Sequence, residues 1–145
     1  MPVRAAQGAL SVDGVLTLPW PSFAPDSPDR ACTVLAARLP LRSLRSVPAA
    51  LTWTWRLHGE LSTTPGVAGH AAALELTDLA LWTVSAWTSR TDLTRFDRSD
   101  LHQTARSVLR PQLWPATFAV WTCAHAALPV SWAEVRARIE SASHC

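Results

Sequence analysis

The chain has 145 residues, enough for one domain with its own apolar core, and 48% of them are hydrophobic. Its formal net charge of +2 is too small to indicate nucleic-acid binding. No apolar run approaches the ~20 residues that span a bilayer, and the first residues make a poor secretory signal. We therefore expect a cytoplasmic protein with neither a nucleic-acid nor a membrane partner.

Missing residue types narrow the possible chemistry. The chain contains no lysine, tyrosine or asparagine, which excludes a lysine Schiff base, a tyrosine acid and an asparagine oxyanion donor. Its three cysteines, Cys32, Cys123 and Cys145, form no CxxC pair and are expected to be free thiols.

The first 30 residues contain five prolines. Proline removes backbone donors, so residues 1–30 are expected to form an irregular arm with a short strand over 12–18. Residues 31–145 are expected to form the domain.

Residues 32–39 form a short β-rich run that predicts the first core strand. Apolar residues then recur at helical spacing from Leu41 to His58, and Pro48 marks the start of that helix or a kink in it. Strands are predicted over 67–76 and 79–88. Their tight connection makes them an antiparallel hairpin.

A helix in two pieces follows, over 91–96 and 99–109. Ser89 or Thr91 can cap the first piece and Ser99 the second, because short side-chain oxygens accept from free backbone N–H groups. A strand is predicted over 116–123. A final helix is predicted over 130–142, with one apolar face that includes Val135 and Ile139.

This order, β-α-β-β-α-β with an N-terminal arm and a C-terminal helix, predicts the α+β class and a ferredoxin-like sheet. Helices are expected on one face of that sheet only. The other face needs a cover, and a second copy of the protein is the expected one, so we predict a homodimer with twofold symmetry.

His102 is the strongest candidate for a catalytic residue. It lies near the capped start of a helix, where the positive helix end keeps an imidazole neutral. A neutral histidine can act as a general base or bind a metal or haem. The alternative is a histidine that only stabilises the fold.

Other residues are candidates for a substrate site. Trp82 and Trp87 should face opposite sides of one strand, whereas Trp55 and His58 should share a helix face. His70 lies in an apolar strand, where a polar side chain needs a partner. Arg95, Arg98 and Arg106 could pair with a substrate carboxylate or phenolate, or with nearby aspartates. The residues expected to bind substrate are Trp55, His58, His70, Trp87, Phe96, Arg106 and Trp121.

Several motifs together resemble a known family. They are a strand with T-x-S-x-W, a helix entered through L-x-x-F-x-x-S and followed by a histidine, and a late P-x-x-W. In this chain they comprise Thr83, Ser85, Trp87, Leu93, Phe96, Ser99, His102, Pro129 and Trp132. They resemble the dimeric α+β-barrel superfamily of antibiotic-biosynthesis monooxygenases, in particular its actinobacterial and spheroidene-monooxygenase-like members. The resemblance covers about residues 31–142.

The resemblance implies a small-molecule pocket between the sheet and the helices. It implies an enzyme of bacterial secondary metabolism that oxidises an aromatic or polyketide-like substrate with O₂, without cofactor or metal, and with His102 as base. Anthrone-oxidising members use Asn, Trp and Tyr, and haem-degrading members also use an Asn, so neither mechanism carries over intact.

Three alternatives stay open. They are a cofactor-free cyclase, isomerase or dehydratase that uses the same histidine, a haem enzyme with His102 or His70 as ligand, and a non-catalytic ligand-binding dimer. The sequence contains no zinc, P-loop or GxGxxG motif.

Overall fold

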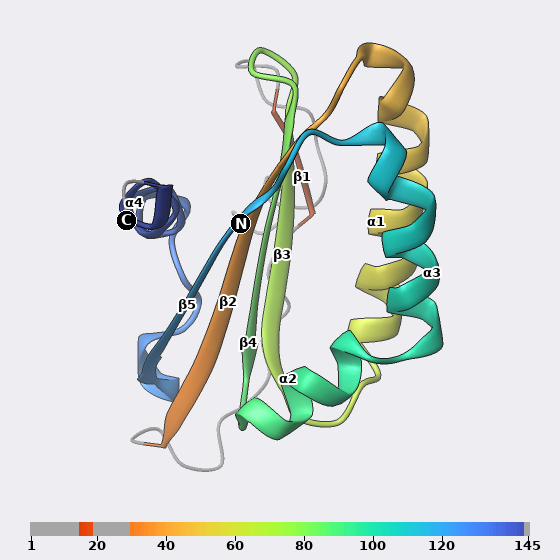
Figure 1. The fold of residues 1–145 in the computed structure, drawn as a ribbon. Coiled ribbons are helices and arrows are strands. Elements are labelled where there is room, and N and C mark those ends of the chain that lie inside the picture. Colours follow the sequence, from red (N-terminus) through yellow and green to blue (C-terminus); the bar gives the residue numbers. More distant parts are fainter. Residues whose placement is uncertain (1–14, 19–29, 144–145) are drawn as a thin grey trace, which may run out of the picture.

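A computed structural model describes residues 15–18 and 30–143 (Figure 1). Within these residues, five strands form one antiparallel sheet in the order β1-β3-β4-β2-β5. The strands are β1 (Val15–Leu18), β2 (Ala31–Pro40), β3 (Val67–Glu75), β4 (Ala80–Trp87) and β5 (Thr117–Ala124). The last four have the ferredoxin-like arrangement that the sequence predicted.

Three helices cover one face of the sheet (Figure 1). They are α1 (Val47–Leu61), α2 (Arg90–Asp97) and α3 (Asp100–Leu109). Pro48 lies in the first turn of α1, where its missing N–H costs nothing, so it starts the helix rather than kinking it. Three short 3₁₀ turns, η2 (Leu44–Ser46), η3 (Arg110–Gln112) and η4 (His125–Ala127), join the longer elements.

The expectation that helices lie on one face only was wrong. Helix α4 (Trp132–Ser143) lies on the opposite face of the sheet (Figure 1). Val135 and Ile139 are buried there against β-sheet residues that include Trp82 and Trp121. The sequence correctly predicted this apolar side of α4, but it did not indicate which face of the sheet the helix would cover. The chain itself therefore covers part of the surface for which a second copy was expected.

The strand predicted over 12–18 is confirmed for Val15–Leu18, which pairs with β3 at the edge of the sheet. The rest of the proline-rich arm, and the cysteine at position 145, lie outside the described residues.

The turn before β3 lies close to Asp92 of α2, and a glycine makes this possible. Gly66 has a φ of +89°, and a Cβ there would come within 2.6 Å of three side-chain atoms of Asp92. The Gly66 carbonyl also accepts a hydrogen bond from the Thr88 N–H at 2.8 Å. The left-handed conformation and this close approach both favour glycine at position 66.

Candidate functional site

The end of α2 and the start of α3 place His102. Ser89 and Ser99 cap the two helices, and the Ser99 hydroxyl accepts from the His102 N–H at 3.3 Å. The sequence predicted the Ser99 cap and named Ser89 as one of two candidates for the other. Because His102 is the third residue of α3, its backbone is fixed by the cap while its side chain remains 27% exposed.

Asp97 and Arg106 flank the imidazole of His102. Its Nδ1 lies 3.5 Å from Asp97 Oδ1 and 3.3 Å from Arg106 Nη2, and Arg106 is also paired with Asp97. A guanidinium only donates, so Arg106 alone would favour an unprotonated Nδ1. A carboxylate only accepts, so the Asp97 contact favours a proton on Nδ1 instead. In the tautomer that carries its proton on Nδ1, Nε2 has a free lone pair and can accept a proton.

The electrostatics of this group keep His102 neutral. Burial lowers the pKa of His102 below its usual value. The Asp97 carboxylate opposes this change, and the Arg106 guanidinium reinforces it. The imidazole is thus in its basic form at neutral pH, as general-base catalysis requires.

Two aromatic rings connect His102 to the sheet. The Phe96 ring lies 5.4 Å from the His102 ring in an edge-to-face arrangement, and 5.4 Å from the Trp87 ring, measured between centroids. Trp87 is fully buried, and its Nε1 donates to Ser85 Oγ at 2.9 Å. A ligand could stack on Trp87 only after displacing Phe96 or the neighbouring sheet residues.

A second group of predicted residues lies beside Ser85. His70 pairs with Ser85 in the β3–β4 register, and the His58 ring meets the His70 ring edge-on at 4.3 Å. Trp55 stacks at 6.4 Å on the outer side of His58 and is 67% exposed. Ser85 accepts a hydrogen bond from Trp87 and lies opposite His70 on the neighbouring strand. It therefore lies between the residues around His102 and the residues around His70.

His70 is only 2% exposed, and its Nε2 has no hydrogen-bond partner among the described residues, as is also true of Trp121 Nε1 and His125 Nε2. Burial, reinforced by the neighbouring His58, lowers the pKa of His70 to about 4. Burial also lowers the pKa of His58. An unpaired polar atom in the interior costs free energy, which makes this position a candidate contact for a ligand.

Trp121 lies away from these residues. The structure places it on the α4 face of the sheet, next to the Arg138 guanidinium, whose carbon lies 4.8 Å from the ring centroid. Trp82 is on the same face and Trp87 on the other, as the alternation along β4 predicted. The structure therefore brings together seven of the eight residues named from the sequence and leaves Trp121 apart.

Asp97 was expected only as an ion-pair partner of the arginines. Its position next to His102 depends on the turn between α2 and α3, where Arg98 N–H donates to the Thr94 carbonyl and Ser99 N–H to the Phe96 carbonyl. The signal in the sequence was an acidic residue just before a capping serine, but its partner could not be read from spacing alone.

Part of the helix-side face of the sheet is uncovered and apolar. The β2 register places Val120 opposite Leu35 and Phe118 opposite Ala37, on the same face as Ser85 and Trp87. Phe118 is 58% exposed and Val120 44% exposed. These side chains offer a flat surface to a ligand or a partner, and the homodimer stays a prediction.

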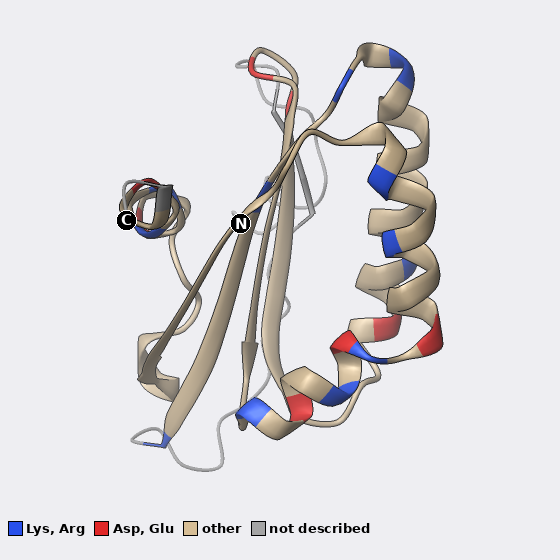
Figure 2. Cartoon of the chain, viewed as in Figure 1, with Lys and Arg blue, Asp and Glu red and all other residues tan. Residues whose placement is uncertain are grey.

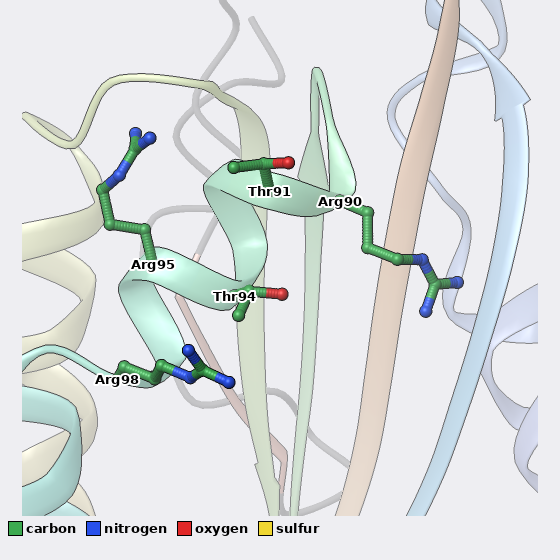
Figure 3. A pocket seen from close by; sticks show the side chains of 5 residues that line it. All are labelled: Arg90, Thr91, Thr94, Arg95 and Arg98. Carbon is green, nitrogen blue, oxygen red and sulfur yellow. The ribbon is translucent and has the colours of Figure 1, made fainter.

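The outer side of α2 lines an open groove of about 700 Å³ (Figure 3). Its residues are Arg90, Thr91, Thr94, Arg95 and Arg98. Arg95 is paired with Asp92 at 2.9 Å, whereas Arg90 and Arg98 form no ion pair within the described part of the chain. Figure 2 shows that charged residues gather on the helices and loops, while the sheet carries few. The groove can therefore receive an acidic group.

Among the described residues, no group of three or more His, Cys, Asp or Glu side chains could hold a metal ion. Likewise, no helix in the ranges 15–18 and 30–143 is long and apolar enough to cross a membrane.

Comparisons with known proteins relate the fold to solved structures. No protein-family model matches the chain, and no curated protein matches it significantly. A candidate antibiotic biosynthesis monooxygenase from Nitrosomonas europaea matches 75% of this chain and 100% of its own, with a TM-score of 0.59 and 12% identity. The cofactor-independent oxygenase SnoaB from Streptomyces nogalater, in a mutant form, matches 68% of this chain and 98% of its own, with a TM-score of 0.55 and 15% identity.

A haem-degrading enzyme from Listeria monocytogenes matches 77% of this chain and 72% of its own, with a TM-score of 0.57 and 15% identity. At these identities the likeness concerns the fold alone. The chain therefore has the ferredoxin-like α+β fold of the antibiotic-biosynthesis-monooxygenase-like proteins.

Proposed function

We propose that the protein is a small-molecule enzyme of bacterial secondary metabolism, a cofactor-independent monooxygenase that acts on an aromatic or polyketide-like substrate. The observation that carries the proposal is His102, whose Nδ1 side faces Asp97 and whose ring contacts Phe96. Solved structures of the same fold include a cofactor-independent oxygenase. We keep the spheroidene-monooxygenase-like subgroup and a cytoplasmic location as predictions.

The proposed reaction begins with proton removal. His102 Nε2 accepts a proton from an activated C–H group of the substrate, and Asp97 stabilises the imidazolium that results. The substrate carbanion transfers its electrons to O₂ and forms a peroxide on carbon. The peroxide takes up a proton and then loses water, leaving a carbonyl group. One oxygen atom enters the product and the other leaves as water.

Two surfaces are proposed to orient the substrate. A flat ring system can lie on the uncovered part of the sheet at Phe118 and Val120. An acidic or phenolic group can pair with Arg90 or Arg98 in the groove along α2, because neither arginine has another ion-pair partner among the described residues. His70 supplies a buried polar atom deeper in the same face.

Substitution of His102 by glutamine tests the proposal. The amide keeps a polar side chain of similar size but cannot accept the proton, so kcat/KM should fall by about 10²–10⁴-fold. The matched control is His125→Gln, in η4 between β5 and α4, which should retain activity. Full activity in the folded His102→Gln variant would remove His102 from the mechanism.

A haem-dependent reaction is the second candidate, because the unpartnered Nε2 of buried His70 could ligate iron. The fit is incomplete, since the His58 ring lies 4.3 Å away and would have to move. An absorption spectrum from 300 to about 700 nm, taken after purification from a haem-supplemented culture, tests it. A Soret band that disappears in His70→Gln would favour haem over the base-driven reaction.

A further inference from the structure

Two of the three cysteines lie directly opposite each other across neighbouring strands. The β2–β5 register pairs Cys32 with Cys123. Both thiols are free and both lie on the α4 face, where Cys32 is buried in the core and Cys123 is partly buried against it. This pair was not predictable from the sequence, because the two positions are 91 apart in the chain and only the strand register brings them together.

The type of pairing follows from a neighbouring hydrogen bond. His125 N–H donates to the Arg30 carbonyl at 2.8 Å. Hydrogen-bonded pairs recur every second residue in an antiparallel ladder, so Cys32 and Cys123, two residues further along both strands, are also a hydrogen-bonded pair. The Cα atoms of such pairs are about 5.5 Å apart, within the range of about 4.4–6.8 Å that disulfides span.

We propose that Cys32 and Cys123 form a reversible disulfide that fastens edge strand β5 to central strand β2. Cβ atoms across a hydrogen-bonded pair lie near 5 Å, whereas a disulfide needs about 3.8 Å. Among the described strands β5 pairs with β2 alone, so forming the bond draws the two cysteines together against the spacing that the ladder hydrogen bonds set. The bond is therefore somewhat strained, a property of disulfides that are readily reduced again.

A peroxide is a suitable oxidant. The more accessible Cys123 thiolate attacks one peroxide oxygen, giving a sulfenic acid on Cys123 and hydroxide. The Cys32 thiolate then attacks the Cys123 sulfur, which forms the S–S bond and releases the sulfenic oxygen as a second hydroxide. In total two thiols lose two electrons and two protons, and one hydrogen peroxide becomes two waters. Burial raises the pKa of both thiols, and each step needs a thiolate, so the reaction should be faster at higher pH.

The test uses the full chain with Cys145→Ser, so that only the pair remains. After treatment with hydrogen peroxide at pH 8.5, the intact mass should fall by about 2 Da, the mass of two hydrogens lost on forming one disulfide. Cleavage after arginine should yield one linked pair of peptides that contain Cys32 and Cys123, and dithiothreitol should reverse both changes. The variants Cys32→Ala and Cys123→Ala, each in the same background, should give no linked peptides.

Refolding from urea in a glutathione redox buffer removes any limit set by access of the oxidant. Linked peptides from the refolded monomer would support the disulfide, even if the folded protein reacts slowly. If both cysteines stay alkylatable in the refolded protein, or if they oxidise only to sulfinic acids or to disulfides between molecules, the proposal is wrong.

Discussion

The two faces of the sheet differ in their chemistry. On the α4 face, Val84 is 2% exposed and lies among alanines and the apolar side of α4. On the face that α1, α2 and α3 cover, His70 is also 2% exposed, and its ring is ionisable. Among the described residues its Nε2 has no hydrogen-bond partner, and the same is true of Trp121 Nε1 on the α4 face. An apolar side chain gains free energy from burial, whereas an unpaired polar atom loses it. The buried histidines on the face that α1, α2 and α3 cover therefore support the proposal that this face carries the function, while the α4 face stabilises the fold.

The first way to test this contrast is to damage the α4 face. Ile139→Ala removes a buried side chain and leaves a cavity, so the free energy of unfolding should fall by about 2–5 kcal/mol. Urea denaturation measures the loss, and kcat of the folded variant should stay near the wild-type value. The exposed control Glu134→Ala should change stability by less than about 0.5 kcal/mol. A folded Ile139→Ala variant without activity would place function on the α4 face as well.

The second test uses acid. The pKa of His70 is about 4 in the folded protein, below its ordinary value of 6.5, so the unfolded chain binds more protons between these two pH values. Stability contributed by His70 is therefore complete above pH 6.5 and is lost as the pH falls, by about 3 kcal/mol at pH 4. Denaturation curves from pH 7 to 4 should show this loss in the wild type.

The matched variant is His70→Gln, which keeps a polar side chain but does not titrate. The difference between the wild-type and variant stability profiles should show the His70 contribution, while the slopes due to other histidines remain in both. Parallel profiles would mean that His70 is not held neutral in the folded protein.

The smallest expected effect concerns the group that orients His102. Asp97→Asn removes a charged neighbour of the imidazole, so kcat/KM should fall about tenfold, equivalent to about 1.4 kcal/mol. Asp97 raises the pKa of His102, so its neutralisation should also move the acid limb of the pH–rate profile to lower pH. A reduced rate with an unchanged profile would assign Asp97 a structural role only.

Local signals made much of the fold predictable from the sequence. The break in the helical pattern at Arg98 and Ser99, with capping serines on both pieces, correctly predicted α2 and α3. Pro48 at a helix start and the tight connection between the third and fourth strands were similarly informative. Each of these features depends on residues within a few positions of each other, and such local interactions can be recognised from the sequence.

Features that depend on packing were not predictable in the same way. The periodicity of α4 predicted which of its residues are buried, but not which sheet face they cover. Trp121 alternates with Phe118 and Val120, and only the register shows that it faces α4 rather than His102. The meeting of Asp97 with His102 and of Cys32 with Cys123 likewise required the turn geometry and the strand pairing.

Oxygen uptake is the measurement that tests the central claim most directly. The wild type, His102→Gln and His125→Gln are each supplied with anthrone in an oxygen electrode, and the rate without protein is subtracted. The account predicts protein-dependent uptake of one O₂ per anthrone consumed, lost in His102→Gln and retained in His125→Gln. Equal uptake by His102→Gln and the wild type, or anthrone consumption without oxygen uptake, would contradict it.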